Sequence, residues 1–168
     1  MKLMKLSLRN FKGIKSFDFE PGGNDAEILG ENASGKSTIV DAWTWLLFGK
    51  DSQNKAAFEI KTINKKGDVS HNLEHEVSAV IFTDKEITLK KVYAEKWTKK
   101  RGSATSEFTG HTTDHFVDGV PVSKSEYQNR VAEIAPEETF RLLTDPRFFN
   151  EQLHWQKRRE ILLDAFGM

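Results

Sequence analysis

Alternating apolar and polar residues open the chain and predict paired strands. Leucines and a methionine alternate with basic and polar residues over residues 1–9, which is the two-residue period of a half-buried strand. A turn at residues 10–13 leads to a second alternating run at 14–19, and residues 21–25 are a dense turn signal. The pattern therefore predicts a hairpin, followed by a short apolar strand at residues 26–29.

Helical periodicity follows over residues 36–48, where apolar side chains recur at spacings of three and four. We expect one buried face, with Asp41 and Thr44 on the opposite side. The residues assigned to the buried face are Ile39, Val40, Trp43, Leu46 and Leu47. Gly49 is a natural end for this helix, because glycine readily takes the left-handed conformation found just past a helix C-terminus.

Strand-like alternation returns from residue 58 and continues to about residue 117. Turn signals at residues 65–68, 84–85 and 118–119 divide this region. The pattern predicts an antiparallel sheet of three to five strands.

The end of the chain is predicted to be helical. Ser123 is a suitable N-cap for a first helix, which Pro136 ends. The side chains expected to be buried in this helix are Tyr127, Val131 and Ile134. A short helix at residues 137–143 and a last helix at residues 155–166 complete the chain.

Length and composition limit the architecture and the partners. A chain of 168 residues, 38% of them hydrophobic, can bury one core, so we interpret it as one lobe with three regions, residues 1–50, 51–120 and 121–168. The 25 basic and 25 acidic residues balance, so no whole-chain field attracts nucleic acid or a membrane. The sequence has no cysteine, no secretory signal and no apolar run of membrane length. We therefore expect a cytoplasmic protein without a membrane partner.

The clearest motif is Gly30-Glu31-Asn32-Ala33-Ser34-Gly35-Lys36-Ser37, a G-x-x-x-x-G-K-S P-loop. Its glycines let the backbone wrap closely around phosphates, and the amides from Ala33 to Thr38 become the donors. Lys36 supplies a positive charge to the β- and γ-phosphates, and the Ser37 hydroxyl is the expected Mg²⁺ ligand. The predicted site for ATP and Mg²⁺ comprises Gly30, Asn32, Ala33, Ser34, Gly35, Lys36, Ser37 and Thr38. A glycine-rich turn with a surface lysine is the alternative, which the expected flanking strand and helix disfavour.

Three blocks around this motif resemble the N-terminal ATPase lobe of the SMC, RecF and SbcC group. The blocks are residues 8–14, 28–38 and 41–50, and the similarity extends to residues 140–167. The closest resemblance is to bacterial and prophage AAA-family ATPases of this group. It implies an α/β fold class, a P-loop NTPase half-domain of an ABC-type head, with a large antiparallel β portion and C-terminal helices.

The resemblance also implies partners and a role. The other half of such a head carries a Ser-Gly-Gly signature, Walker B acids and a switch histidine, which are not found in this sequence. The implied partner is therefore a C-terminal lobe of the same protein or a second copy, with DNA as a further partner in repair, recombination or DNA processing. No catalytic residue is assigned, and a Q-loop residue is left open among Gln152, Gln156 and Asp145. Lys12 is implied to lie near the nucleotide; a turn lysine in water is the alternative.

Two other functions stay open. The chain could bind ATP without hydrolysing it, as a nucleotide-dependent interaction module. It could also be a small P-loop kinase, but such enzymes continue in βα units after the first helix, whereas this sequence turns to antiparallel alternation.

Other residues suit further contacts less specifically. Residues 97–102 combine a tryptophan, three adjacent charges and a glycine, which suits a nucleic-acid hairpin, although a solvated hairpin tip is the favoured interpretation. Basic residues over 2–15 form either a DNA-facing rim or an edge that deters aggregation. His111 and His115 are four apart, but their surroundings indicate strand or loop, which disfavours a metal site.

Overall fold

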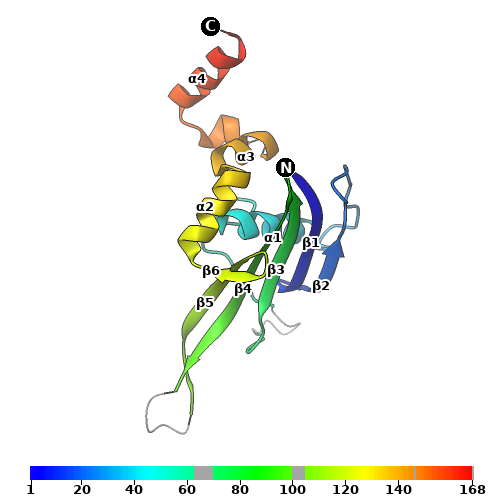
Figure 1. The fold of residues 1–168 in the computed structure, drawn as a ribbon, viewed down its shortest axis with the longest axis vertical. Coiled ribbons are helices and arrows are strands. Elements are labelled where there is room, and N and C mark those ends of the chain that lie inside the picture. The colour runs from blue at the N-terminus through cyan, green and yellow to red at the C-terminus, as the bar shows by residue number, and fades with distance from the viewer. Residues whose placement is uncertain (63–69, 100–104, 146, 168) are drawn as a thin grey trace. The chain divides into compact units, whose positions relative to one another are not determined.

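The computed structural model describes residues 1–62, 70–99, 105–145 and 147–167, and Figure 1 shows its fold. The chain forms two compact units, Met1–Val131 and Ala132–Met168. The first unit holds the sheet, a helix packed against it and the beginning of a second helix. The second unit is helical where it is described.

The sheet has six antiparallel strands in the order β2-β1-β3-β4-β5-β6. Their bounds are β1 Lys2–Phe11, β2 Ile14–Phe19, β3 His75–Phe82, β4 Glu86–Thr98, β5 Glu107–Val117 and β6 Val120–Val122. The chain leaves the sheet after β2 and returns beside β1, while β4 and β5 form a long hairpin (Figure 1). The predicted N-terminal hairpin and the mixed α/β fold class, with an antiparallel sheet and C-terminal helices, are confirmed.

The strand prediction over residues 58–117 is correct only in part. β3, β4 and β5 lie in this range, and the first turn between them falls at residues 83–85, near the predicted position. Residues 58–62 belong to no strand. Ile60 is nevertheless buried, and its carbonyl accepts a hydrogen bond of 2.8 Å from the Lys12 amide. The predicted turn at residues 65–68 lies outside the described residues.

The core of the first unit forms between the sheet and helix α1, Lys36–Phe48. Alternate residues of the strands face this helix, and each fully buried apolar side chain contributes about 1.5–3 kcal/mol. The most deeply buried are Leu6, Leu8 and Phe11 of β1, Val77 and Ile81 of β3, Leu89 of β4, and Ala42, Leu46 and Leu47 of α1. Phe11 and Trp45 join the layers, with ring centroids 5.5 Å apart.

The predicted buried face of α1 is partly wrong. Val40 is 51% exposed, whereas Asp41 and Thr44 are buried. Both polar side chains have partners that make burial tolerable. The Thr44 hydroxyl donates to the Val40 carbonyl at 3.0 Å, and the Asp41 carboxylate pairs with Lys12. The buried side of the helix is therefore rotated relative to the apolar pattern.

Four helical elements follow the sheet. They are α2 Lys124–Ile134, α3 Glu137–Thr144, the π-helix η1 Phe148–Gln152 and α4 Trp155–Ala165. The Ser123 hydroxyl accepts from the Glu126 amide at 3.2 Å, so the predicted N-cap of α2 is confirmed. Tyr127 and Val131 are buried as expected, whereas Ile134, also predicted to be buried, is only half-buried. In the part of the chain that the structure describes, no helix is long and apolar enough to span a membrane.

Candidate nucleotide-binding loop

The P-loop is a tight turn that leads directly into α1. Ala33 has φ 64° and Gly35 has φ 94°, so two positions of the loop adopt the left-handed conformation. This conformation is uncommon for alanine, and such outliers concentrate at functional sites. Left-handed residues next to right-handed ones turn successive backbone amides toward one side, which creates an anion-binding concavity.

Steric and conformational constraints explain why glycine occupies two positions of the loop. A Cβ on Gly30 would lie 2.8 Å from the Ser34 hydroxyl oxygen, so a larger residue would require the Ser34 side chain to move. A side chain on Gly35 would be strained by its positive φ and would contact Ile14 of β2 at 3.5 Å. Both positions therefore favour glycine, Gly30 because of the nearby Ser34 side chain and Gly35 because of its positive φ beside Ile14.

Lys36 lies across the loop. Its Nζ donates to the carbonyls of Gly30 and Glu31, at 2.5 and 2.6 Å. Two carbonyl oxygens therefore hold the ammonium at the loop, and a charged donor of this kind also suits the anionic oxygens of a ligand. The site thus has a positive charge and the positive end of a helix beside each other.

The first turn of α1 leaves its amides available to a ligand. Gly35 occupies the N-cap position and provides no side-chain cap, and the first turn has no acidic residue. The unpaired amides of a helix N-terminus favour an anion. Ser37 is exposed and Thr38 is half-buried, while Asn32, Ala33 and Ser34 are exposed. The structure therefore places all the predicted loop residues around one turn at the N-terminus of the helix.

Ser37 fits a magnesium site of the kind in which the ligand supplies most of the oxygens. Mg²⁺ keeps several waters and is usually bound through a few protein oxygens together with substrate phosphates. Among the described residues, no group of three or more histidine or acidic side chains comes together to form an all-protein cage. The Ser37 hydroxyl at the start of α1 is the oxygen that the sequence motif predicts as the Mg²⁺ ligand.

The segment before the loop differs from the prediction. Residues 26–29 belong to no strand, and Leu29 is 84% exposed. A strand needs a neighbour to pair with, and this segment lies outside the ladder of the six strands. The sequence pattern identified an apolar run correctly but could not show whether a pairing strand was present.

Lys12 is held against the side of α1. It lies in the turn between β1 and β2 with φ 52°, its Nζ pairs with Asp41, and the Nζ is 5.0 Å from the centroid of the Phe58 ring. Asp41 is five residues after Lys36, about 7.5 Å along the helix axis. A nucleotide contact by Lys12 stays a prediction, and the structure adds that this lysine already has a partner.

Asp41 is a buried carboxylate that sequence analysis misplaced. Its second oxygen accepts from the Ser52 amide at 3.0 Å and from the Ser52 hydroxyl at 2.5 Å. Burial raises the pKa of this carboxyl, but the hydrogen bonds from Lys12 and Ser52 outweigh burial and lower the pKa below its ordinary value. The ionised Asp41 therefore ties the β1–β2 turn and the segment after α1 to the helix. An acidic residue inside an apolar helical run was the available signal.

The candidate DNA-contact residues have partners of their own. Lys5 pairs with Glu20 at 2.5 Å and Arg9 with Asp18 at 2.9 Å, so the basic rim is partly neutralised across the hairpin. Trp97 is 43% exposed and packs edge-on against another ring at 5.6 Å. The basic residues at 100 and 101 lie outside the described residues.

A cluster of polar side chains centres on Glu95 of β4. The Glu95 carboxylate accepts from Lys61 at 2.7 Å, from His71 at 2.8 Å and from the Trp97 indole at 3.1 Å. The hydrogen bonds from Lys61 and His71 hold the pKa of this carboxyl well below its usual range. His111 stacks on Tyr93 with ring centroids 4.9 Å apart. These side chains thus have structural partners.

The fold and the loop define an ATPase domain of the AAA type. The chain belongs to the family described as "AAA domain", whose model matches residues 5–166. The resemblance to the N-terminal ATPase lobe of the SMC and RecF group is confirmed by this match.

Comparison with solved structures finds a similarity to one titled "Structure of the recombination mediator protein RecF-ATP in RecFOR pathway". The two chains are 18% identical with a TM-score of 0.48, and the match covers 97% of this chain and 38% of that chain. The chain therefore spans well under half the length of that protein. No curated protein matches the sequence.

Proposed function

We propose that this chain is the ATP-binding lobe of a two-lobed ATPase, and that bound ATP with Mg²⁺ closes it onto its second lobe. The observation that carries the proposal is the arrangement of Lys36 across the Gly30 and Glu31 carbonyls at an uncapped helix N-terminus. A charged donor beside several free amides is complementary to a polyphosphate.

In this proposal, different groups of the loop contact different parts of the nucleotide. The amides from Ala33 to Thr38 bind phosphate oxygens, and Lys36 exchanges its two carbonyl partners for the β- and γ-phosphates. Ser37 would hold Mg²⁺ through its hydroxyl, and the ion would neutralise part of the phosphate charge. Lys12 reaches the nucleotide in this proposal only by leaving Asp41, so its contact is linked to movement of the β1–β2 turn.

The second lobe, from the same protein or from a second copy, completes the site. Leu29 is 84% exposed directly before the loop, and residues 26–29 have backbone outside the sheet ladder. Pairing with a strand of the other lobe would cover the Leu29 side chain and would give this backbone hydrogen-bond partners. Hydrolysis also needs an acid that positions the attacking water, and Asp41 is occupied by Lys12 and Ser52. DNA is the proposed partner on which the assembled protein acts, in repair, recombination or DNA processing.

Calorimetry with Mg-ATP tests the binding step. Lys36→Ala removes the charge held inside the loop, and loss of hydrogen bonds to a charged group costs about 1.5–3 kcal/mol, which weakens binding roughly 10- to 100-fold. Lys55→Ala is the matched control, because Lys55 is exposed outside the loop. Equal affinities of wild type and Lys36→Ala would refute the assignment of the site.

A steady-state ATPase assay separates binding from turnover. We expect the chain alone to bind ATP and to hydrolyse it negligibly, and turnover to appear when a C-terminal lobe is added. Lys36-dependent turnover by the chain alone, at about one per second or faster, would show that a catalytic acid is already present. No turnover after addition of the second lobe would instead support the alternative, a module that binds ATP without hydrolysing it.

A further inference from the structure

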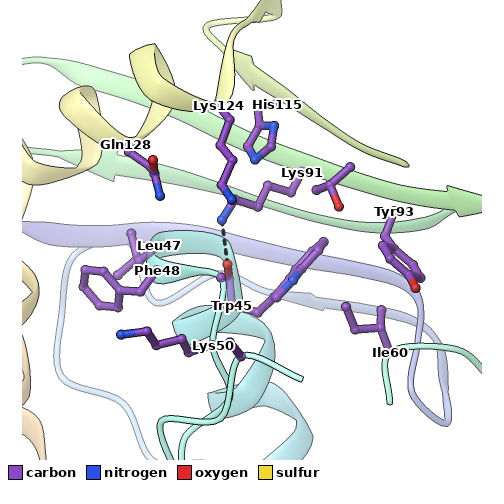
Figure 2. A pocket seen from close by; sticks show the side chains of 13 residues that line it. Trp45, Leu47, Phe48, Lys50, Ile60, Lys91, Tyr93, His115, Lys124 and Gln128 are labelled. Carbon is purple, nitrogen blue, oxygen red and sulfur yellow. Dashed lines mark hydrogen bonds between the residues drawn. The ribbon is translucent and has the colours of Figure 1, made fainter. Parts of the chain in front are cut away.

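A second concave site lies at the opposite end of α1 from the P-loop. A cavity of about 580 Å³ opens between the C-terminal end of α1, strands β4 and β5 and the beginning of α2 (Figure 2). Its volume is in the range of small-molecule sites, roughly 300–1,000 Å³. One side is aromatic and apolar, with Trp45, Phe48, Tyr93 and Ile60 in its lining. The residues all belong to the first unit.

Lys91 is the most deeply buried basic side chain in the lining of this cavity. It is 5% exposed on β4, and its Nζ donates to the Trp45 carbonyl at 2.8 Å. The same Nζ lies 5.6 Å from the centroid of the Trp45 ring and 5.0 Å from that of Tyr127. An ammonium has three donors, and among the described residues no carboxylate pairs with this one. Buried charges ordinarily have such a partner.

Two further basic side chains reach the same space. Lys124 extends into the cavity from the start of α2, and His115 lines it from β5 (Figure 2). Burial, and then the charge of Lys124, lowers the pKa of Lys91 to about 7. Burial, and then the charges of both lysines, lowers the pKa of His115. No acidic side chain is part of the described lining of this cavity.

A purely structural role explains this arrangement poorly. Lys91 could serve to cap the C-terminal carbonyls of α1, since cations are favoured there. However, the Trp45 carbonyl already accepts from the Gly49 amide at 2.9 Å, and the Leu46 carbonyl accepts from the Tyr127 hydroxyl at 3.0 Å. The capping account also gives no reason for a second lysine in the same space.

We propose that this cavity binds a small aromatic anion, with its ring against Trp45 and Tyr93 and its carboxylate or phosphate between Lys91 and Lys124. An anion there supplies the charged partner that Lys91 lacks among the described residues, and the aromatic side removes the ring from water. Because Lys91 is 5% exposed, the anionic group must enter the cavity end-on, which suits a small molecule rather than the flat surface of a polymer. This site is separate from the P-loop and does not depend on the function proposed for it.

Titration with benzoate and phenyl phosphate, followed by amide and indole NMR signals, tests the proposal. The two probes share a ring and differ in the anionic group. We expect saturable shifts of the Trp45 indole and the Thr113 amide, with Kd on the order of a millimolar. The Gly35 amide reports the P-loop separately, and it should not move with benzoate. Benzyl alcohol is the neutral control and should bind at least about tenfold more weakly.

Variants assign the effect to the two lysines. Lys91→Met keeps an apolar stem without the charge, and Lys124→Gln changes an exposed residue, so it remains informative if the first variant is poorly folded. Each should weaken binding at least about tenfold, the loss expected for a charged hydrogen bond. Lys90→Gln is the matched control, because Lys90 lies over the Phe116 ring at 4.6 Å and near Glu76 at 3.6 Å.

Three results would overturn the proposal. They are the absence of saturable shifts at Trp45 with either anion, equal binding of benzyl alcohol, and unchanged binding in Lys124→Gln and a folded Lys91→Met. Shifts confined to the Gly35 amide would place the probe in the P-loop and equally contradict this site.

Discussion

The buried ammonium of Lys91 makes stability depend on pH in a window where few other groups titrate. Burial lowers its pKa from 10.5 to about 7 in the folded protein. Between these two values the unfolded chain binds more protons than the folded one, so the free energy of unfolding rises with pH. Below pH 7 both states carry the proton, and this gain is absent.

The size of the effect follows from the linkage relation. Each pH unit inside the window is worth about 1.4 kcal/mol for one group. Raising the pH from 6 to 9 should therefore increase the free energy of unfolding by roughly 2–3 kcal/mol through Lys91. Lys124, His115 and Tyr127 face this group. Burial lowers the pKa of His115 below 6.5 and raises that of Tyr127 above 10, so neither titrates between pH 7 and 9.

Urea unfolding at pH 6, 7, 8 and 9, followed by tryptophan fluorescence, measures this dependence. In Lys91→Met the rise should disappear, so wild type minus variant isolates the contribution of one lysine. Lys90→Met controls for loss of a lysine from the same strand and should retain the wild-type rise. Parallel curves for wild type and Lys91→Met would show that Lys91 keeps an ordinary affinity for its proton, and the argument from burial would fail.

Two further predictions concern ion pairs and DNA. Asp41→Asn leaves Lys12 without its carboxylate in a partly buried site, and we expect a loss of about 1–3 kcal/mol in urea unfolding. Asp18→Asn removes the exposed pair with Arg9 and should cost less than Asp41→Asn, so equal losses would contradict the ranking by burial. Serine at all three of residues 99–101 should flatten the log–log salt dependence of DNA binding by up to about three, and an unchanged slope would make this segment a solvated turn.

Local patterns were sufficient to predict most of the elements. Period-two runs located the N-terminal hairpin and strands β3–β5; in β1, β3 and β4 the alternation arises because one side of the strand faces the α1 core. The α1 helix and its glycine stop were also predictable from spacing alone. Its buried face was not, because apolar residues occur on more than one side of this helix, and the choice depends on Asp41. A charged residue is buried only if distant partners exist, and here they come from Lys12 and Ser52.

The P-loop could be located from eight residues, but its surroundings depend on longer-range pairing. The apolar run at residues 26–29 has strand composition and no ladder position, which no local pattern reveals. The buried position of Lys91 could have been predicted from the sequence. It continues the alternation of Ile87 and Leu89, so the period-two rule places it on the buried side of β4. A lysine at an inward position is a signal for a cationic site.

The two ends of α1 differ in whether side chains hydrogen-bond to their backbone groups. At the C-terminal end, Lys91 and Tyr127 donate to the carbonyls of Trp45 and Leu46, and in the middle Lys12 clamps Asp41. These contacts fix the helix against the sheet and α2. At the N-terminal end no side chain caps the amides. A helix anchored far from its first turn can hold those amides in a binding geometry without occupying them, so the ATP of our proposal would bind a preorganised site whose ordering cost is offset by packing of the core.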